Sequence, residues 1–222
     1  MIALSIDAEL KRLVPRVCVG TLVGRVVVVP QDAELWQEID RRVQQIHQQF
    51  TLESLRREPQ IQGLWNAYKA LGNDPTRYRG SSESLGRRII QGKGLYQVNS
   101  VVDINNLVSL ESLFSVGTVD LERVRPPIVL RPGRAQESYA GIGRGAIKLE
   151  AIPVFVDQLG PFASTTSDSE RSMVSLTTER ILMLVISFDG PAGLDDALRR
   201  AGDLLTRYAQ ARELETAVVR VP

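Results

Sequence analysis

A polar stripe on an otherwise apolar segment is the first set of residues that could do chemistry. Asn99, Asp103 and Asn106 are spaced by four and three residues, so they share one face of a helix predicted within residues 99–120. Burying amides and a carboxylate costs about 1–3 kcal/mol each unless hydrogen-bond partners are supplied. The stripe therefore predicts either a satisfied internal network or the floor of a polar pocket.

Two further segments carry groups that suit binding or catalysis. The polar loop 160–170 is rich in hydroxyls and ends in Asp168 and Glu170. A basic cluster follows the Asp-Pro turn near residue 75, and it suits contacts with phosphates, although a solvated surface would look the same. The members of this basic cluster are Arg77, Arg79, Arg87, Arg88 and Lys93.

Composition limits the chemistry. One cysteine, Cys18, and one histidine, His47, cannot build a Cys/His zinc site, and we expect neither a metal nor a cofactor. No apolar run approaches the ~20 residues that span a bilayer, and residues 1–17 lack the apolar core of a signal peptide, so we expect a cytoplasmic protein without membrane contact. The net charge is +1, but residues 77–148 carry eleven basic and six acidic side chains.

Hydrophobic periodicity predicts the elements that must position these groups. β-branched runs predict strands, and three- and four-residue spacing predicts helices. We expect one domain over residues 1–222, of α+β class, with a mixed sheet or barrel-like core surrounded by helices and a C-terminal strand-helix-strand unit. The predicted strands cover 13–29, 128–131, 152–157, 181–188 and 216–221, the helices 32–58, 61–71, 81–90 and 194–212, and an irregular loop 132–145.

Several short motifs together resemble one known family. They are RGSS at 79–82, NSVVDINNLV at 99–108, FSVGTVD at 114–120, VFVD at 154–157 and TSDSERSMV at 166–174. Their order and spacing resemble the editing domain of the phenylalanyl-tRNA synthetase beta subunit, the B-three/B-four domain, and especially its free-standing relatives. The resemblance covers about residues 73–190 and implies a pocket between a β core and surrounding helices.

The resemblance also implies site residues. Asn106 matches the family's pocket asparagine, Asn105 replaces the threonine beside it, and Gly117 stands where the family has a pocket histidine. The carboxylate that reads the polar part of the substrate aligns with Glu170, and Asp168 is the competing choice. Further donors for the substrate are supplied by Thr165, Thr166 and Ser167.

These residues favour a hydrolase that acts in trans on mischarged aminoacyl-tRNA. Glu170 and Asn106 would be catalytic, water would be positioned at the ester, and the basic cluster would face the tRNA acceptor end. The alternative is a non-catalytic module that binds a free amino acid or a similar small molecule. A third interpretation is a protein-interaction subunit.

Overall fold

The computed structural model describes residues 2–143 and 145–220, which form two four-stranded sheets, a hairpin and a set of helices. The helices are α1 (Ala8–Leu13), α2 (Ala33–Gln49), α3 (Leu52–Arg56), α4 (Pro59–Ala70), α5 (Ser81–Ile90), α6 (Ser100–Ser112) and α7 (Leu194–Tyr208), with 3-10 turns η1 (Leu121–Arg123) and η2 (Glu170–Ser172). The strands are β1 (Leu4–Ile6), β2 (Cys18–Arg25), β3 (Ser115–Asp120), β4 (Ile128–Pro132), β5 (Ser138–Gly141), β6 (Gly145–Lys148), β7 (Pro153–Asp157), β8 (Gly160–Ser164), β9 (Arg180–Ser187) and β10 (Arg212–Arg220).

The two sheets have the strand orders β1-β4-β7-β8 and β10-β2-β9-β3, and β5 pairs with β6. This arrangement confirms the α+β class and the mixed β core. Within the described residues the sheets do not close into a barrel, because β3 and β10 are edge strands of one sheet and β1 and β8 of the other. Also among the described residues, no helix is both long and apolar enough to cross a membrane.

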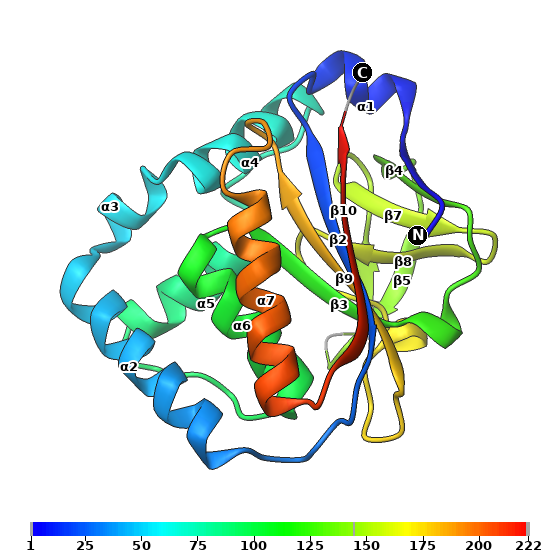
Figure 1. Ribbon diagram of the computed structural model, residues 1–222. Coiled ribbons are helices and arrows are strands. Elements are labelled where there is room, and N and C mark those ends of the chain that lie inside the picture. The colour runs from blue at the N-terminus through cyan, green and yellow to red at the C-terminus, as the bar shows by residue number, and fades with distance from the viewer. Residues whose placement is uncertain (1, 144, 221–222) are drawn as a thin grey trace.

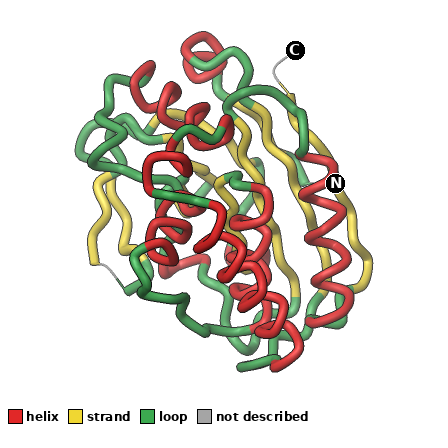
Figure 2. The backbone as a smooth tube through the Cα atoms, turned by 90° about the vertical axis from the view of Figure 1, so that its left-hand side faces the viewer, coloured by secondary structure: helices red, strands yellow, loops and turns green. Residues whose placement is uncertain are grey.

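The side chains of β9 alternate between two cores. Met183 and Val185 belong to the core beneath the helices, whereas Leu182 and Leu184 belong to the core between the two sheets. Helices α2, α5, α6 and α7 lie on one side of the β10-β2-β9-β3 sheet, and the second sheet lies on its other side (Figure 1). The view turned by 90° shows helices in front of most of the strands (Figure 2).

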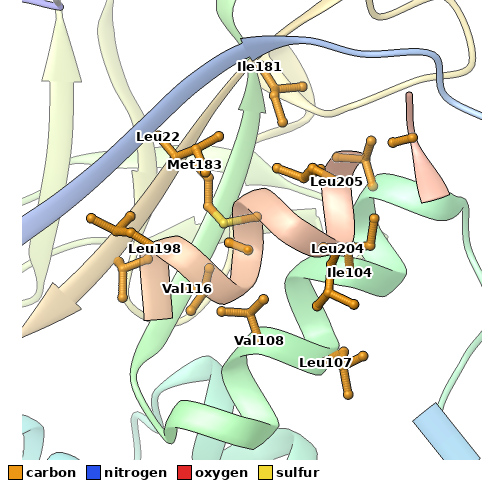
Figure 3. Packing of buried hydrophobic residues seen from close by; sticks show 14 of the residues in the cluster. Leu22, Ile104, Leu107, Val108, Val116, Ile181, Met183, Leu198, Leu204 and Leu205 are labelled. Atoms are coloured by element: carbon orange, nitrogen blue, oxygen red, sulfur yellow. The ribbon is translucent and has the colours of Figure 1, made fainter. Parts of the chain in front are cut away.

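The C-terminal strand-helix-strand unit is confirmed. Strands β9 and β10 both pair antiparallel with β2, so they run parallel to one another and α7 crosses over between them. The buried face of α7, including Leu198 and Leu205, packs on Leu22 and Met183 of the sheet and on α6 (Figure 3).

The structure corrects several predicted boundaries. The helix predicted to run to about Glu58 ends at Gln49, because Thr51 starts α3 with a capping box and Pro59 then begins α4. Residues 99–120 are a helix followed by a strand: α6 ends where Leu113 takes a left-handed conformation (φ 60°), and the β-branched run after it forms β3. The predicted loops 132–145 and 160–170 contain strands β5 and β8, and the strand predicted over 13–29 is limited to β2.

Candidate functional site

The polar stripe on α6 is mainly an internal network. Asn99 caps the helix by accepting a hydrogen bond from Val102 N–H (3.0 Å). The buried Asp103 carboxylate accepts from Trp36 Nε1 (2.8 Å) and Val98 N–H (3.0 Å), and its burial raises its pKa. Asp103 therefore holds α6 to α2 and to the chain before it, whereas Asn99 stabilises the start of α6 itself. Asn106 is half-buried at the end of the stripe.

Asn105 and Gly117 lie on opposite faces of β3. Thr118 faces the helices and donates from Oγ1 to Asn105 Oδ1 (2.9 Å), and Asn105 Nδ2 lies 3.5 Å from Asn106 Oδ1. Gly117 is the next residue along the strand, so it faces the second sheet, where Asp168 lies. The structure therefore divides the predicted pocket residues into two groups with the strand between them.

A small inter-sheet recess is formed where β3, β8 and Asp168 meet. Its volume is about 10 Å³, roughly the space of one water molecule. A Cβ atom added at Gly117 would lie 3.0 Å from Asp168 Oδ1, so the glycine leaves room directly in front of the carboxylate. The polar members of the recess are Ser115, Ser164 and Asp168, and its walls are Val116, Phe155, Ala163, Leu184 and Ile186.

The Asp168 carboxylate is distinctive because it accepts no hydrogen bond from any described residue, although the backbone carbonyl of Asp168 accepts from Ile142 N–H (3.3 Å). Burial among the recess walls raises the pKa of Asp168 to about 7. Larger surface hollows, up to about 620 Å³, have mixed linings in which the described carboxylates, such as Glu179 and Asp189, are all exposed. A half-buried carboxylate that accepts no hydrogen bond from a described residue, and whose pKa is raised, identifies the recess as the candidate site.

Hydroxyl groups fix the loop that carries Asp168. The hydroxyls of Tyr68 and Thr165 are 2.7 Å apart, and both are buried. Tyr139 donates to Ser164 Oγ (2.8 Å) and makes a short contact with the carbonyl of Ser167. Ser164 Oγ in turn lies 3.0 Å from Thr166 Oγ1. The predicted hydroxyls of residues 165–167 therefore shape the loop around the recess.

Helix α5 begins beside this loop. Its Ser81 N–H donates to the carbonyl of Thr165 (3.1 Å). The Ser81 hydroxyl donates to the carbonyl of Val116 (3.3 Å) and accepts from Val116 N–H (3.2 Å), so it bonds the free edge of β3. Gly80 occupies the N-cap position, and a Cβ there would lie 2.7 Å from Ser115 Oγ.

Most of the chain matches a known protein family. A family model described as the B3/4 domain matches residues 64–210. The chain belongs to the B3/4 domain family. The matched region of this B3/4 domain contains the recess, its hydroxyl network and helices α5, α6 and α7.

The fold has a counterpart among solved structures. An N-terminal fragment of the phenylalanyl-tRNA synthetase beta subunit from Pyrococcus horikoshii matches with a TM-score of 0.51 and 13% sequence identity. The alignment covers 96% of the B3/4 chain and 50% of that fragment, so the chain spans half the length of the solved fragment. At this identity the likeness shows a shared fold. A comparison with curated proteins gives no match.

Glu170 and the arginines lie outside the recess of this B3/4 domain. Glu170 is exposed at the start of η2, which contacts β5, β8 and η1, whereas Asn106 is on α6, which contacts α2, α5, α7 and β3. The two residues predicted to be catalytic are thus on separate elements. The basic cluster is spread from the loop before α5 to the turn after it, a distance of about 15 Å along the helix axis.

Arg79 is the cation of the cluster nearest to buried acid. Its Nε lies 3.7 Å from Oε1 of Glu83, whose other oxygen accepts from Trp65 Nε1 (2.8 Å). Arg77 and Lys93 are exposed. In the described structure, no cluster of three or more His, Cys, Asp or Glu side chains could hold a metal ion.

Tyr68 and Tyr139 support the loop beside the recess, and the sequence alone did not reveal either of them. Tyr68 follows the apolar spacing of α4, so the sequence predicts an ordinary core residue there and gives no indication of a role for its hydroxyl. Tyr139 lies in a segment predicted to be irregular, and only its pairing in β5 brings it to Ser164. No sequence pattern indicates that a tyrosine lies next to the TTSD segment (residues 165–168) in the folded protein.

The raised pKa of Asp168 predicts a pH signature. An aspartate in an unfolded chain titrates near pH 4, below the folded value of about 7. Protonation therefore favours the fold, and this stabilisation is fully present below about pH 4 and lost as pH rises through about 7. We expect Asp168→Asn to melt higher than the wild type at pH 8, on the order of 5 °C, and nearly the same at pH 4. Calorimetry at both pH values tests this, and parallel pH dependences of the two proteins would contradict it.

Proposed function

We propose that this B3/4 domain hydrolyses the ester bond of aminoacyl-tRNA. The observation that carries the proposal is the Asp168 carboxylate, which faces a water-sized recess without accepting a hydrogen bond from a described residue. Membership of the B3/4 family and a fold shared with a fragment of the phenylalanyl-tRNA synthetase beta subunit support a substrate related to tRNA.

The reaction needs one water and one proton acceptor. The Asp168 carboxylate takes a proton from water as the water oxygen attacks the carbonyl carbon of the ester. The bond between that carbon and the ribose oxygen then breaks, and the proton passes to the leaving ribose oxygen. A pKa of about 7 suits this role, because a general base works best when its pKa lies near the operating pH.

The neighbouring groups would assist in distinct ways. The hydroxyl of Ser115 borders the recess and can donate to the oxygen on which negative charge develops, while the Ser164 hydroxyl already donates to the carbonyl of Ser167 (2.9 Å). The recess is too small for an amino-acid side chain, so the substrate would approach from its mouth and only water would enter. The proposal gives the proton-transfer role to Asp168, because Glu170 and Asn106 lie outside the recess.

Ester loss from a panel of mischarged tRNAs tests this function. We expect at least one aminoacyl-tRNA to be deacylated faster than in buffer, and Asp168→Asn to lower that rate by about 100-fold. Glu170→Gln is the matched control, since it removes an exposed carboxylate two residues away, and it should keep the wild-type rate. Buffer-level hydrolysis of every member of the panel would refute the proposal.

One observation favours a second candidate, a module that binds a free amino acid. Gly117 places no functional group where the resemblance expects a histidine, and Asp168 alone can bind an ammonium group without catalysis. In that case the panel would stay acylated, while free amino acids would raise the melting temperature of the wild type and not that of Asp168→Asn.

A further inference from the structure

The turn after α5 presents an aromatic ring to solvent. Tyr96 is 67% exposed, the largest exposed fraction among the large hydrophobic side chains described. The guanidinium of Arg88 lies 3.9 Å from the ring centroid, a cation–π contact that occupies one face of the ring. Most of the remaining ring surface is therefore open.

The ring is held in place by its surroundings. Gly92 and Gly94 have positive φ angles (70° and 61°), which lets the chain turn back after α5. Leu95 packs against the core formed by α2, α5 and α6. Arg88 is fixed from the other side, because its terminal nitrogen donates to the carbonyl of Lys93 (3.2 Å). An exposed aromatic ring that is already ordered loses little entropy on binding.

The charge around Tyr96 is positive. Arg87, Arg88 and Lys93 lie within seven residues, and in the described structure none of them forms a salt bridge with an acidic side chain. The acidic residue of α5 itself, Glu83, is buried at the opposite end of the helix. Unpaired cations beside an open aromatic ring suit a ligand that is both polyanionic and aromatic.

We propose that Tyr96, backed by Arg88, is a stacking platform for an unpaired base of RNA, and that Arg87 and Lys93 bind the adjoining phosphates. Base stacking on aromatic side chains combined with phosphate contacts is how single strands are bound. The assignment rests on the proposed function in one respect, since the strand is identified as the single-stranded end of a tRNA. Helix α5 links the platform to the recess, because Ser81 at its start bonds Thr165.

Fluorescence anisotropy with a labelled RNA heptamer ending in CCA tests the platform. The matched probe has the same sugars and phosphates with every base removed. We expect Tyr96→Ala to weaken binding of the heptamer by about 5- to 100-fold and to leave the abasic strand unaffected, whereas Tyr96→Phe should bind like the wild type. Arg87→Ala should weaken both strands alike and reduce the salt dependence.

Control measurements separate this inference from the proposed function. Leu159→Ala removes another exposed apolar side chain and should change neither affinity. An equal loss for both strands in Tyr96→Ala, no loss, or tighter binding of a polyglutamate peptide than of RNA would overturn the platform. The heptamer carries no ester, so its binding is measured independently of deacylation. Tyr96-dependent binding without any deacylation would refute only the proposed hydrolase activity. Deacylation without Tyr96-dependent binding would refute only the stacking platform.

Discussion

Arg171→Met is expected to lower the free energy of unfolding by about 3–5 kcal/mol, because it leaves a buried carboxylate without its counter-charge. The Asp157 side chain is fully buried and receives two hydrogen bonds of 3.0 Å from the Arg171 guanidinium. The same guanidinium donates to the carbonyls of Arg123 and Gly160, so it ties η1, η2 and the β7–β8 turn together. The melting temperature should fall on the order of 10 °C.

The acid limb of the stability curve provides a second signature of this pair. Burial by itself raises the pKa of Asp157, but the hydrogen bonds from Arg171 and from the backbone N–H groups of Arg125 and Leu159 lower it overall. The stabilisation is therefore present above about pH 4 and lost as pH falls through the lowered folded pKa. The difference in free energy of unfolding between the wild type and Arg171→Met should therefore become smaller at acid pH.

Arg199→Met is the matched control for Arg171→Met. It breaks an ion pair with Asp196 in which both side chains are more than two-thirds exposed, and such pairs contribute at most about 1 kcal/mol. Chemical denaturation of the three proteins at pH 7 compares them directly. Equal losses in the two variants would show that burial of Asp157 does not govern this effect.

Gly117→Val is expected to abolish deacylation while the protein still folds. Its Cβ would lie 3.0 Å from Asp168 Oδ1, and its two methyl groups would fill a recess of about 10 Å³. The backbone of Gly117 is not in the left-handed region, and a β-branched residue suits a strand, so the cost is one of crowding, about 1–3 kcal/mol. Ester loss in the tRNA panel and a melting curve of the variant measure both effects.

Thr118→Val is the control for Gly117→Val, because it changes the next residue on the opposite face of β3. It removes the hydrogen bond to Asn105 and should cost about 1 kcal/mol of stability with no loss of activity. The reverse pattern, with Thr118→Val inactive and Gly117→Val active, would assign the chemistry to Asn105 and Asn106 and exclude the recess.

Much of the fold could be predicted from residue patterns, because periodicity reports which side of an element is buried. The C-terminal unit and strand β9 follow from long, regular apolar spacing. The boundary between α6 and β3 could not be read this way. Both elements are apolar on most sides, and the break depends on the backbone conformation of Leu113, a residue type that does not mark a helix end.

The candidate site was predictable in part. The hydroxyl-rich loop and Asp168 stand out as a polar segment, and the family resemblance directs attention to Gly117. The sequence does not show on which face of β3 each residue lies, because the face depends on the exact limits of the strand. The choice between Asp168 and Glu170 likewise depends on the recess, which only the meeting of two sheets creates.

The hydroxyl of Ser81 has a consequence for the alignment of β3. By bonding both the N–H and the carbonyl of Val116, it selects that residue as the one opposite the start of α5. A slip of β3 by one residue along β9 would put Thr118 in the recess and Gly117 against Asn105. A serine on a neighbouring helix thereby helps the β9 ladder to hold the registration on which the space in front of Asp168 depends.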